Sequence, residues 1–403
     1  RLRNAALRRA GKRSRPTLPE QTLPAGPFDL FLAIFHFPQQ LAQLDALPGW
    51  RERARTAVCY IVEAWSRELP RYAKYLHLLD QFDQVFVLNQ ASIPTLQTFT
   101  RAPLTFLPTA TDTERFCPLP LDPARVIDVY SYGRRSPAAH AAMLDLSRHE
   151  PFYYIYDTLG DASIVDFRAH RDLLANTLKR SRYTIAYPVN ANRGARTGGE
   201  EALTTRYFEG AASGAIMLGD APATPEFREC FDWPDAIFDF PFEPDDIRAD
   251  FAALDADPQR LTAARWTGVA QSLRRHDWLH RWQRVLDAAG LAHTPAMARR
   301  AERLDALAWT SEGNAGTGSM DGRRRETPRE TLAASPIEAS RTAPSVAGSG
   351  ASRAARVERH ATRAVRAPLQ DSLFRRGGGR RCPNCAELSP GTAVACVYCG
   401  ERL

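Results

Sequence analysis

The sequence contains no long hydrophobic run. Its longest apolar stretch, residues 28–37, is interrupted by Asp29 and His36 and is too short to cross a bilayer as a helix. The basic N-terminus is not followed by the apolar core of a signal peptide, so a cytoplasmic location is the default expectation. Because the sequence begins at Arg1 and not at Met, we expect a fragment or a misassigned start.

Cysteine is scarce outside the C-terminus. Of the seven cysteines, Cys59, Cys117 and Cys230 are scattered through apolar or loop contexts, which indicates reduced thiols and not a disulfide framework. No internal repeat is found at the periods typical of solenoids. The apolar and charged fractions, 44% and 25%, are those of a globular protein, and 403 residues suffice for two or three domains.

The net charge of +7 is distributed unevenly. Arginines crowd residues 1–15 and 299–381, whereas residues 236–258 are acidic. Basic segments can bind nucleic acid or anionic lipid, but solvated flexible segments are the more common case. We expect residues 1–23 to be a disordered basic arm. Residues 294–380, rich in Ala, Arg, Ser, Gly and Thr, are expected to be a disordered linker with helical character only at 297–309.

Short apolar runs alternate with helical patterns between residues 24 and 293, which predicts an α/β fold with parallel sheets. We expect two Rossmann-like doubly wound domains facing a cleft, at 24–122 and 123–293. The first has only four strands and is expected to be truncated, and the second ends in an amphipathic helix. Predicted strands lie at 28–35, 57–62, 84–88, 104–107, 126–132, 152–156, 183–187 and 215–218. Predicted helices lie at 70–79, 93–98, 136–148, 166–179, 205–213, 244–254 and 258–275.

Four cysteines form two Cys-x-x-Cys pairs at the C-terminus, separated by ten residues: Cys382, Cys385, Cys396 and Cys399. Two such pairs supply the four thiolates of a tetrahedral, structural Zn²⁺ site. A redox dithiol is the alternative, but paired knuckles favour zinc. Residues 381–403 resemble a zinc ribbon, which would be an interaction module for a protein partner.

The stretch from Glu201 to Asp220 combines a loop, a short helix, a glycine and a buried strand. Glu201 and Glu209 stand eight positions apart around the predicted helix start. Free N–H groups at such a helix start can bind phosphates, and a carboxylate there can accept hydrogen bonds from ribose hydroxyls. The alternative is an acid that stabilises the helix N-terminus by up to ~1 kcal/mol.

Three segments together resemble the nucleotide-sugar glycosyltransferases of the GT-B fold, in particular the group-1 and spore-protein-like enzymes. Pro108 to Phe116 is similar to their interdomain phrase, although the usual glycine is absent. Gly133 and Arg134 after a predicted strand are similar to the start of their donor domain. Glu201 and Glu209 keep the spacing of their paired glutamates. The resemblance covers residues 28–290.

The resemblance implies transfer of a hexosyl group from a nucleotide-sugar to an acceptor sugar, lipid or protein. It places Arg134 on the diphosphate, Glu209 on the ribose and Glu201 beside the donor sugar, with Gly214 in the donor-binding helix turn. A lysine that often follows the Gly-Arg phrase is absent, and Arg206 or Arg135 would replace it. No catalytic metal is required, because guanidinium groups can stabilise the leaving diphosphate.

Other residues have two interpretations. His276 and His280 mimic a metalloprotease helix but lack its Glu and a third ligand, so a structural role is favoured. His36 and Glu63 follow predicted strands and could act as a base toward an acceptor hydroxyl, or could simply be polar residues at the cleft edge. The alternative function is a non-catalytic scaffold whose basic linker and zinc ribbon bind a protein or nucleic acid.

Overall fold

The computed structural model describes residues 23–24, 26–133, 135–157, 166–188, 197–317, 380–381 and 388–389. The described residues up to 317 belong to one compact unit, and the last two pairs belong to a second. These two pairs are strands β10 (Arg380–Arg381) and β11 (Leu388–Ser389), which are antiparallel. Within the part of the chain that the structure describes, no helix has the length and apolarity to cross a membrane.

The first sheet has four parallel strands in the order β1-β2-β3-β4. The strands are β1 (Phe28–Phe35), β2 (Ala54–Ile61), β3 (Gln84–Val87) and β4 (Leu104–Phe106). Short helical segments connect them: η1 (Pro38–Ala46), η2 (Leu69–Tyr72), α2 (Ala73–Leu76), η3 (His77–Gln81), η4 (Gln90–Ser92) and α3 (Ile93–Gln97). All four predicted strands are present. The helix predicted at 70–79 is a succession of short turns, and η1 was not predicted.

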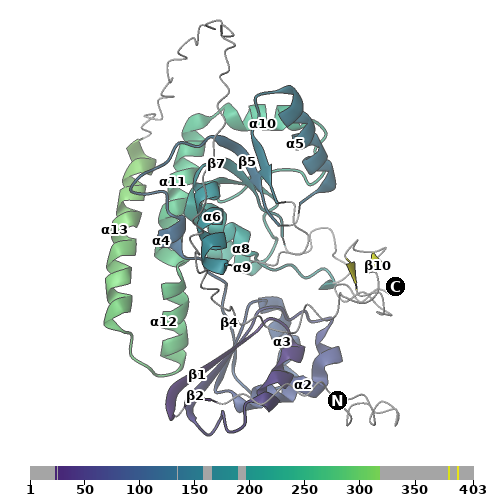
Figure 1. Ribbon diagram of the computed structural model, residues 1–403, viewed down its shortest axis with the longest axis vertical. Helices are drawn as coiled ribbons and strands as arrows, with labels where there is room; N and C mark the ends of the chain where they lie inside the picture. Colours follow the sequence, from purple (N-terminus) through teal and green to yellow (C-terminus); the bar gives the residue numbers. More distant parts are fainter. Residues whose placement is uncertain are drawn as a thin grey trace, which may run out of the picture. The chain divides into compact units, whose positions relative to one another are not determined.

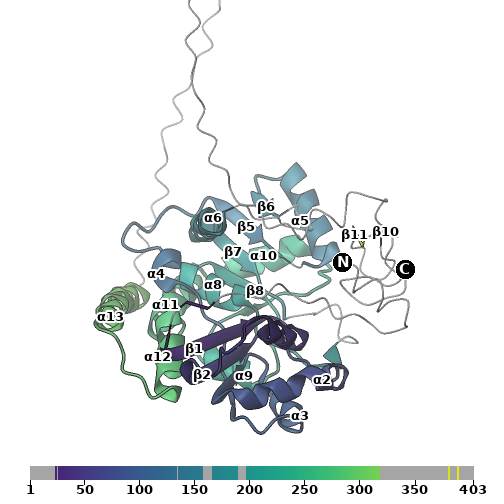
Figure 2. The same cartoon turned by 60° about the horizontal axis from the view of Figure 1, so that its bottom comes forward.

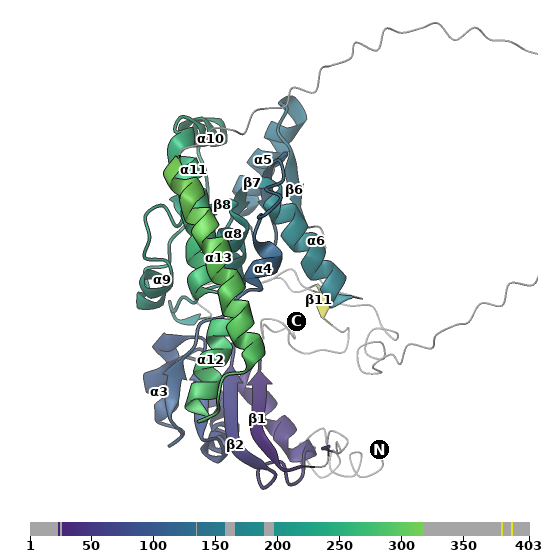
Figure 3. The same ribbon diagram turned by 90° about the vertical axis from the view of Figure 1, so that its left-hand side faces the viewer.

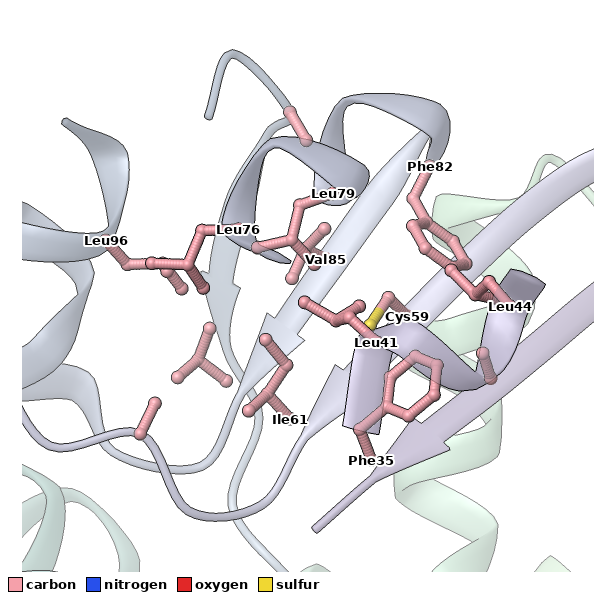
Figure 4. Close-up of a cluster of buried hydrophobic side chains, with 14 of the residues drawn as sticks. Phe35, Leu41, Leu44, Cys59, Ile61, Leu76, Leu79, Phe82, Val85 and Leu96 are labelled. Carbon is pink, nitrogen blue, oxygen red and sulfur yellow. The ribbon is translucent and has the colours of Figure 1, made fainter. Parts of the chain in front are cut away.

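Alternate residues of the first sheet face two different layers, as the pleat requires. On one face, side chains such as Ile61 and Val85 pack against Leu41 and Leu76 from the connecting segments, which Figure 4 shows in close-up. On the other face, Tyr60 and its neighbours pack against a single helix, α12 (Trp278–Ala288). Figure 2 shows α12 beside β1 and β2.

The second sheet has five parallel strands in the order β6-β5-β7-β8-β9. The strands are β5 (Ile127–Ser131), β6 (Tyr154–Tyr156), β7 (Ser181–Ile185), β8 (Ile216–Gly219) and β9 (Phe238–Asp239). The helices are α4 (Thr113–Phe116), α5 (Pro137–His149), α6 (Phe167–Lys179), α8 (Thr205–Ser213), α9 (Pro225–Cys230), α10 (Ile247–Asp255) and α11 (Pro258–Arg275).

Helices cover both faces of the second sheet (Figure 1). Val129 faces a core that includes Met143 of α5 and Phe251 of α10. The next residue along β5, Tyr130, faces the opposite core with Leu174 of α6 and Ala212 of α8. The predicted α/β class with parallel, doubly wound sheets is thereby confirmed. Strand β9 and helices α4 and α9 were not predicted, since each has six residues or fewer.

The chain crosses between the two sheets twice, and the two crossings are hydrogen-bonded to each other. The backbone N–H of Thr111 donates to His276 O at 3.0 Å, and that of Trp278 donates to Thr111 O at 3.2 Å. Arg281, which is 6% exposed, donates from Nε to Pro108 O at 2.9 Å and from Nη2 to Thr109 O at 2.8 Å. The crossings are therefore fixed to one another by both backbone and side chain.

The helix predicted to close the second domain packs instead on the first sheet. In α12, Val285 contacts the layer formed by Val58 and Tyr60. The helix follows directly after the second crossing, so it returns to the first half of the molecule. A pattern of apolar residues shows that a helix is amphipathic but does not identify the surface that it covers.

Part of the predicted disordered linker 294–380 is a helix. Helix α13 (Pro295–Thr317) lies along α11 (Figure 3). Its buried Leu304 and Ala308 pack against Trp266 and Leu273 of α11. The expectation of helical character only at 297–309 was too narrow, because Ser311, which is 0% exposed, and Ala315, which packs on the same cluster, also belong to the buried face of α13.

Candidate donor site

The site begins where β5 ends. Tyr132, the residue after the strand, stacks on Tyr130 with ring centroids 5.1 Å apart. Its hydroxyl donates to Oε2 of Glu209 at 2.9 Å. Burial, together with the charge of Glu209, raises the pKa of Tyr132 well above its usual range. The phenol therefore remains protonated and acts as a donor to Glu209 at every physiological pH.

Glu209 lies in the interior of the site. It is 2% exposed, and Oε1 accepts from Nη1 of Arg171 at 2.5 Å. Arg171 projects from α6, where its guanidinium lies over the ring of Phe116 at 4.9 Å and approaches Oγ1 of Thr111 at 3.4 Å. A buried carboxylate requires such a partner, because an isolated charge is costly to remove from water. Sequence reasoning missed Arg171, whose distance of 38 residues from Glu209 gives no local signal.

Gly133 and Arg206 meet beside this pair. Gly133 has φ of 71°, and a Cβ there would lie 2.7 Å from Nη1 of Arg206, so only glycine fits. The N–H of Gly133 donates to Oδ2 of Asp157 at 2.7 Å. Arg206 donates from Nη2 to Tyr187 O at 3.4 Å, at the end of β7. The guanidinium of Arg206 therefore lies at the carboxyl ends of β5 and β7.

Arg206 retains hydrogen-bonding capacity. Its Nε is buried without a hydrogen-bond partner among the described residues. Arg206 and Glu209 lie three positions apart on α8 and both act on the pKa of Tyr132, while Arg171 bonds Glu209. Two cations and a carboxylate with spare lone pairs form a site that suits an anionic, hydroxyl-bearing ligand.

Glu201 lies in the segment that leads into α8, and its Oε2 accepts from the N–H of Ala223 at 3.2 Å. Glu201 and Arg206 are both close enough to Tyr207 to shift its pKa. Burial raises the pKa of Tyr207 most, the charge of Arg206 lowers it, and the charge of Glu201 raises it. Its neighbour Glu200, which the sequence analysis did not single out, contacts the first half of the molecule instead.

Gly214 is not brought together with these residues. It terminates α8 in the left-handed region, with φ of 66°. A Cβ there would lie 3.0 Å from both Nη2 of Arg125 and Cγ2 of Val269. Because α8 has nine residues, Gly214 lies about 13 Å from the helix start. The contacts indicate a helix cap that permits close packing against α11, in place of the predicted donor-binding role.

Several predicted residues fall outside the described part of the chain. These are Arg134 and the four predicted zinc ligands, Cys382, Cys385, Cys396 and Cys399. Arg135, the other candidate for the missing lysine, pairs from Nη2 with Oδ1 of Asp157 at 2.9 Å and lies over the ring of Tyr156 at 5.2 Å. These contacts fix Arg135 against β6.

His36 and Glu63 lie together at the carboxyl ends of β1 and β2. Nε2 of His36 is 3.3 Å from Oε1 of Glu63, and their side chains are 52% and 30% exposed. The hydrogen bond to Glu63 raises the pKa of His36, so the pair favours an imidazolium beside a carboxylate.

His276 and His280 each bond a different backbone carbonyl. Nε2 of His276 lies 2.8 Å from Cys230 O, and Nε2 of His280 lies 3.3 Å from Leu273 O. Burial and the nearby charge of Arg281 hold the pKa of His276 well below its usual range. Among the described residues, no group of His, Cys, Asp and Glu has an arrangement that could hold a metal ion.

Comparisons with known proteins give one sequence match and several distant structural likenesses. No curated protein matches the chain. Three solved structures are similar to it: Anabaena Alr3699/HepE in complex with UDP-glucose, at 14% identity and TM-score 0.44 over 64% of this chain and 78% of that one; TarM, at 10% and 0.40 over 64% and 54%; and the glycosylation-associated Gap123 complex from Streptococcus agalactiae, at 9% and 0.33 over 70% and 55%. At these TM-scores the likenesses carry no argument about function.

The sequence match covers three strands of the second sheet, β7, β8 and β9, and the last residue of β6. Residues 156–287 match a family model described as "Glycosyl transferase-like". This stretch extends from the end of β6 to α12 and includes Arg171, Arg206 and Glu209. Three of the residues that meet at the candidate site thus lie within a glycosyltransferase-like segment, whereas Tyr132 and Gly133 precede it, and sugar transfer is the general class of activity that the match supports.

Proposed function

We propose that the chain is a glycosyltransferase of the GT-B type that binds a nucleotide-sugar at the carboxyl edge of the second sheet. One observation carries the proposal. Glu209, which is 2% exposed, is held by Tyr132 and Arg171 beside the under-used guanidinium of Arg206, within the glycosyltransferase-like segment. A buried charged cluster with spare hydrogen-bonding capacity at the end of parallel strands is typical of a ligand site.

In the proposed reaction, the bond between the anomeric carbon and the diphosphate breaks and a new bond forms to an acceptor hydroxyl. Negative charge then accumulates on the departing diphosphate, where Arg206 and Arg134 would stabilise it. Glu209 would accept hydrogen bonds from ribose hydroxyls, and Glu201 would face the sugar. The acceptor proton would pass to a base at the first sheet, where Glu63 is the candidate.

Calorimetric titration of the full chain with UDP-glucose and GDP-mannose tests the donor site. Wild type is expected to bind at least one of them. Arg206→Gln removes charge-assisted hydrogen bonds worth about 1.5–3 kcal/mol, so the dissociation constant should rise about 10- to 100-fold. Arg228→Gln, an exposed arginine on α9, is the matched control and should bind as wild type does. Absence of binding to wild type would reject the proposal.

We further propose that Cys382, Cys385, Cys396 and Cys399 bind one structural Zn²⁺. Strands β10 and β11 pair on either side of the first Cys-x-x-Cys in the chain, with Arg381 opposite Leu388. We expect about one zinc per chain by plasma mass spectrometry. Replacing Cys382 and Cys385 with serine should abolish it, whereas Cys230→Ala should retain it. Metal-free wild type that forms a disulfide would favour the redox alternative.

A further inference from the structure

One carboxylate next to the proposed donor site bonds the first half of the molecule. Oε2 of Glu200 accepts from the backbone N–H of Ser66 at 3.1 Å and from Nδ2 of Asn89 at 3.0 Å. Ser66 follows β2, and Asn89 follows β3. Glu200 precedes α8 by only a few residues, so it connects the carboxyl edge of the first sheet to the segment that carries Glu201 and Arg206.

The partners of Glu200 are themselves well fixed. Asn89 is 2% exposed, and its Nδ2 also donates to Ala64 O at 3.1 Å. Gly198 lies near the same part of the first half, since a Cβ added to it would lie 3.5 Å from Cδ of Arg67. The hydrogen bonds from the segment before α8 to the first half are those of Glu200.

The two adjacent glutamates have different tasks. Glu201 bonds Ala223 within the second half, whereas the carboxylate of Glu200 bonds Ser66 and Asn89 of the first half. A charged acceptor forms stronger hydrogen bonds than a neutral one, and these two bonds join elements more than 100 residues apart in the chain. One side chain thus links the carboxyl edge of the first sheet to the segment before α8, in addition to the hydrogen bonds between the two crossings.

We propose that Glu200 is a positioning residue that holds the acceptor-side edge of the first sheet against the donor segment. This inference rests on the proposed function. Transfer requires an acceptor hydroxyl to reach the anomeric carbon at near-contact distance, and an error of 1 Å in that approach can cost ~100-fold in rate. Loss of the Glu200 contact would leave donor binding largely unchanged, because the proposed donor site lies in the second half alone.

The test first places two carboxylates at the contact between residues 89 and 200 and then removes one of them. Asn89→Asp places a second carboxylate about 3 Å from Glu200, where like charges repel. Adding Glu200→Gln removes the repulsion between the two carboxylates, so the double variant should recover part of the loss, although the donation from residue 89 to Ala64 O stays absent. Asn176→Asp, which makes the same charge change at an exposed position of α6, is the matched control.

Three measurements on the full chain are needed: the dissociation constant for UDP-glucose, the rate at which glucose is released from it, and the distance between spin labels. The labels are introduced as unnatural amino acids at the exposed Glu52 and Arg148, one in each half. Asn89→Asp is expected to slow release about 10- to 100-fold, broaden the distance distribution and change the dissociation constant less than about threefold. The double variant should reverse these changes in part, whereas Asn176→Asp should leave all three measurements as in wild type.

Unchanged release and distance in Asn89→Asp would overturn the inference. So would parallel losses of binding and turnover without rescue, because they indicate local damage and not positioning. If wild type binds neither UDP-glucose nor GDP-mannose, the proposed function fails instead. The distance measurement then still decides whether Glu200 holds the two halves in register, since it needs no ligand.

Discussion

Replacing Arg300 with methionine is expected to lower the free energy of unfolding by about 3–5 kcal/mol. Arg300, on α13, donates from Nε to Oδ1 of Asp277 and from Nη2 to Oδ2, both at 2.8 Å. The side chain of Asp277 is 0% exposed. It also accepts from Thr113 and Leu279, but those neutral donors cannot balance its charge. Methionine keeps most of the length of arginine and leaves the buried carboxylate without its cation.

A nearby arginine provides the control. Arg303 is one turn further along α13, its side chain is 56% exposed, and it pairs with Glu114 at 2.7 Å. Because exposed ion pairs contribute little, Arg303→Met should change the unfolding free energy by less than about 1 kcal/mol. Urea denaturation of the two variants and wild type measures the difference. Equal losses would show that Asp277 does not need Arg300.

The same pair gives a dependence on pH. Burial by itself would raise the pKa of Asp277, but hydrogen bonds from Arg300, Leu279 and Thr113 outweigh it, and the pKa lies below its usual range. A carboxyl whose pKa is lowered by folding stabilises the protein above its unfolded pKa, and this contribution disappears as pH falls through the folded pKa. The gap between wild type and Arg300→Met should therefore be largest near neutral pH and narrow below about pH 4.

Replacing Gly219 with alanine is expected to cost more than about 4 kcal/mol, which places it among the most damaging single substitutions. Gly219 ends β8 with φ of 152°, and a Cβ there would lie 2.1 Å from the backbone oxygen of Ala186. Relief requires β7 and β8 to separate. The distortion would reach the donor site, because Asp220, the next residue, accepts at its backbone oxygen from the hydroxyl of Tyr207 at 3.0 Å.

Gly290→Ala is the control that measures the cost of a positive φ without a steric clash of the new Cβ. Gly290 has φ of 64°, but nothing lies within 4 Å of the position of its Cβ. Strain alone should cost about 1–2 kcal/mol. Thermal unfolding of both variants, followed by circular dichroism, would show a much larger loss for Gly219→Ala. Similar losses in the two variants would mean that the close approach of β7 and β8 contributes little.

Local sequence signals predicted elements with strong boundaries. The helices at 205–213 and 258–275 have the predicted bounds, because Gly214 can adopt the left-handed cap and Pro258 follows the N-cap Asp257. The strand at 28–35 likewise has its predicted bounds. In each case the residues that end the element lie next to it in the chain, so one sequence is sufficient to find them.

Interactions between distant segments were not predictable in this way. Helix α13 packs on α11, where Leu304 covers Trp266, and this surface is not visible in the sequence of α13 itself. In the sequence, Arg171 cannot be distinguished from the many other arginines. Its role depends on its contact with Glu209, which only the fold creates. Glu200 gained its partners from β2 and β3, 134 and 111 residues away. The motif spacing pointed to Glu209, and Arg206 was one of two candidates for a missing lysine, but neither signal pointed to Tyr132 or Arg171, which bond Glu209.

The bridge between Thr111 and Asp277 has a mechanical consequence. Two connections that are bonded side by side leave the halves of the molecule with one soft degree of freedom, a rotation about the line on which both connections lie. Sliding or twisting would break the bonds between Thr111 and residues 276 and 278. The two hydrogen bonds of Glu200 to Ser66 and Asn89 add a further tie that opposes such a rotation.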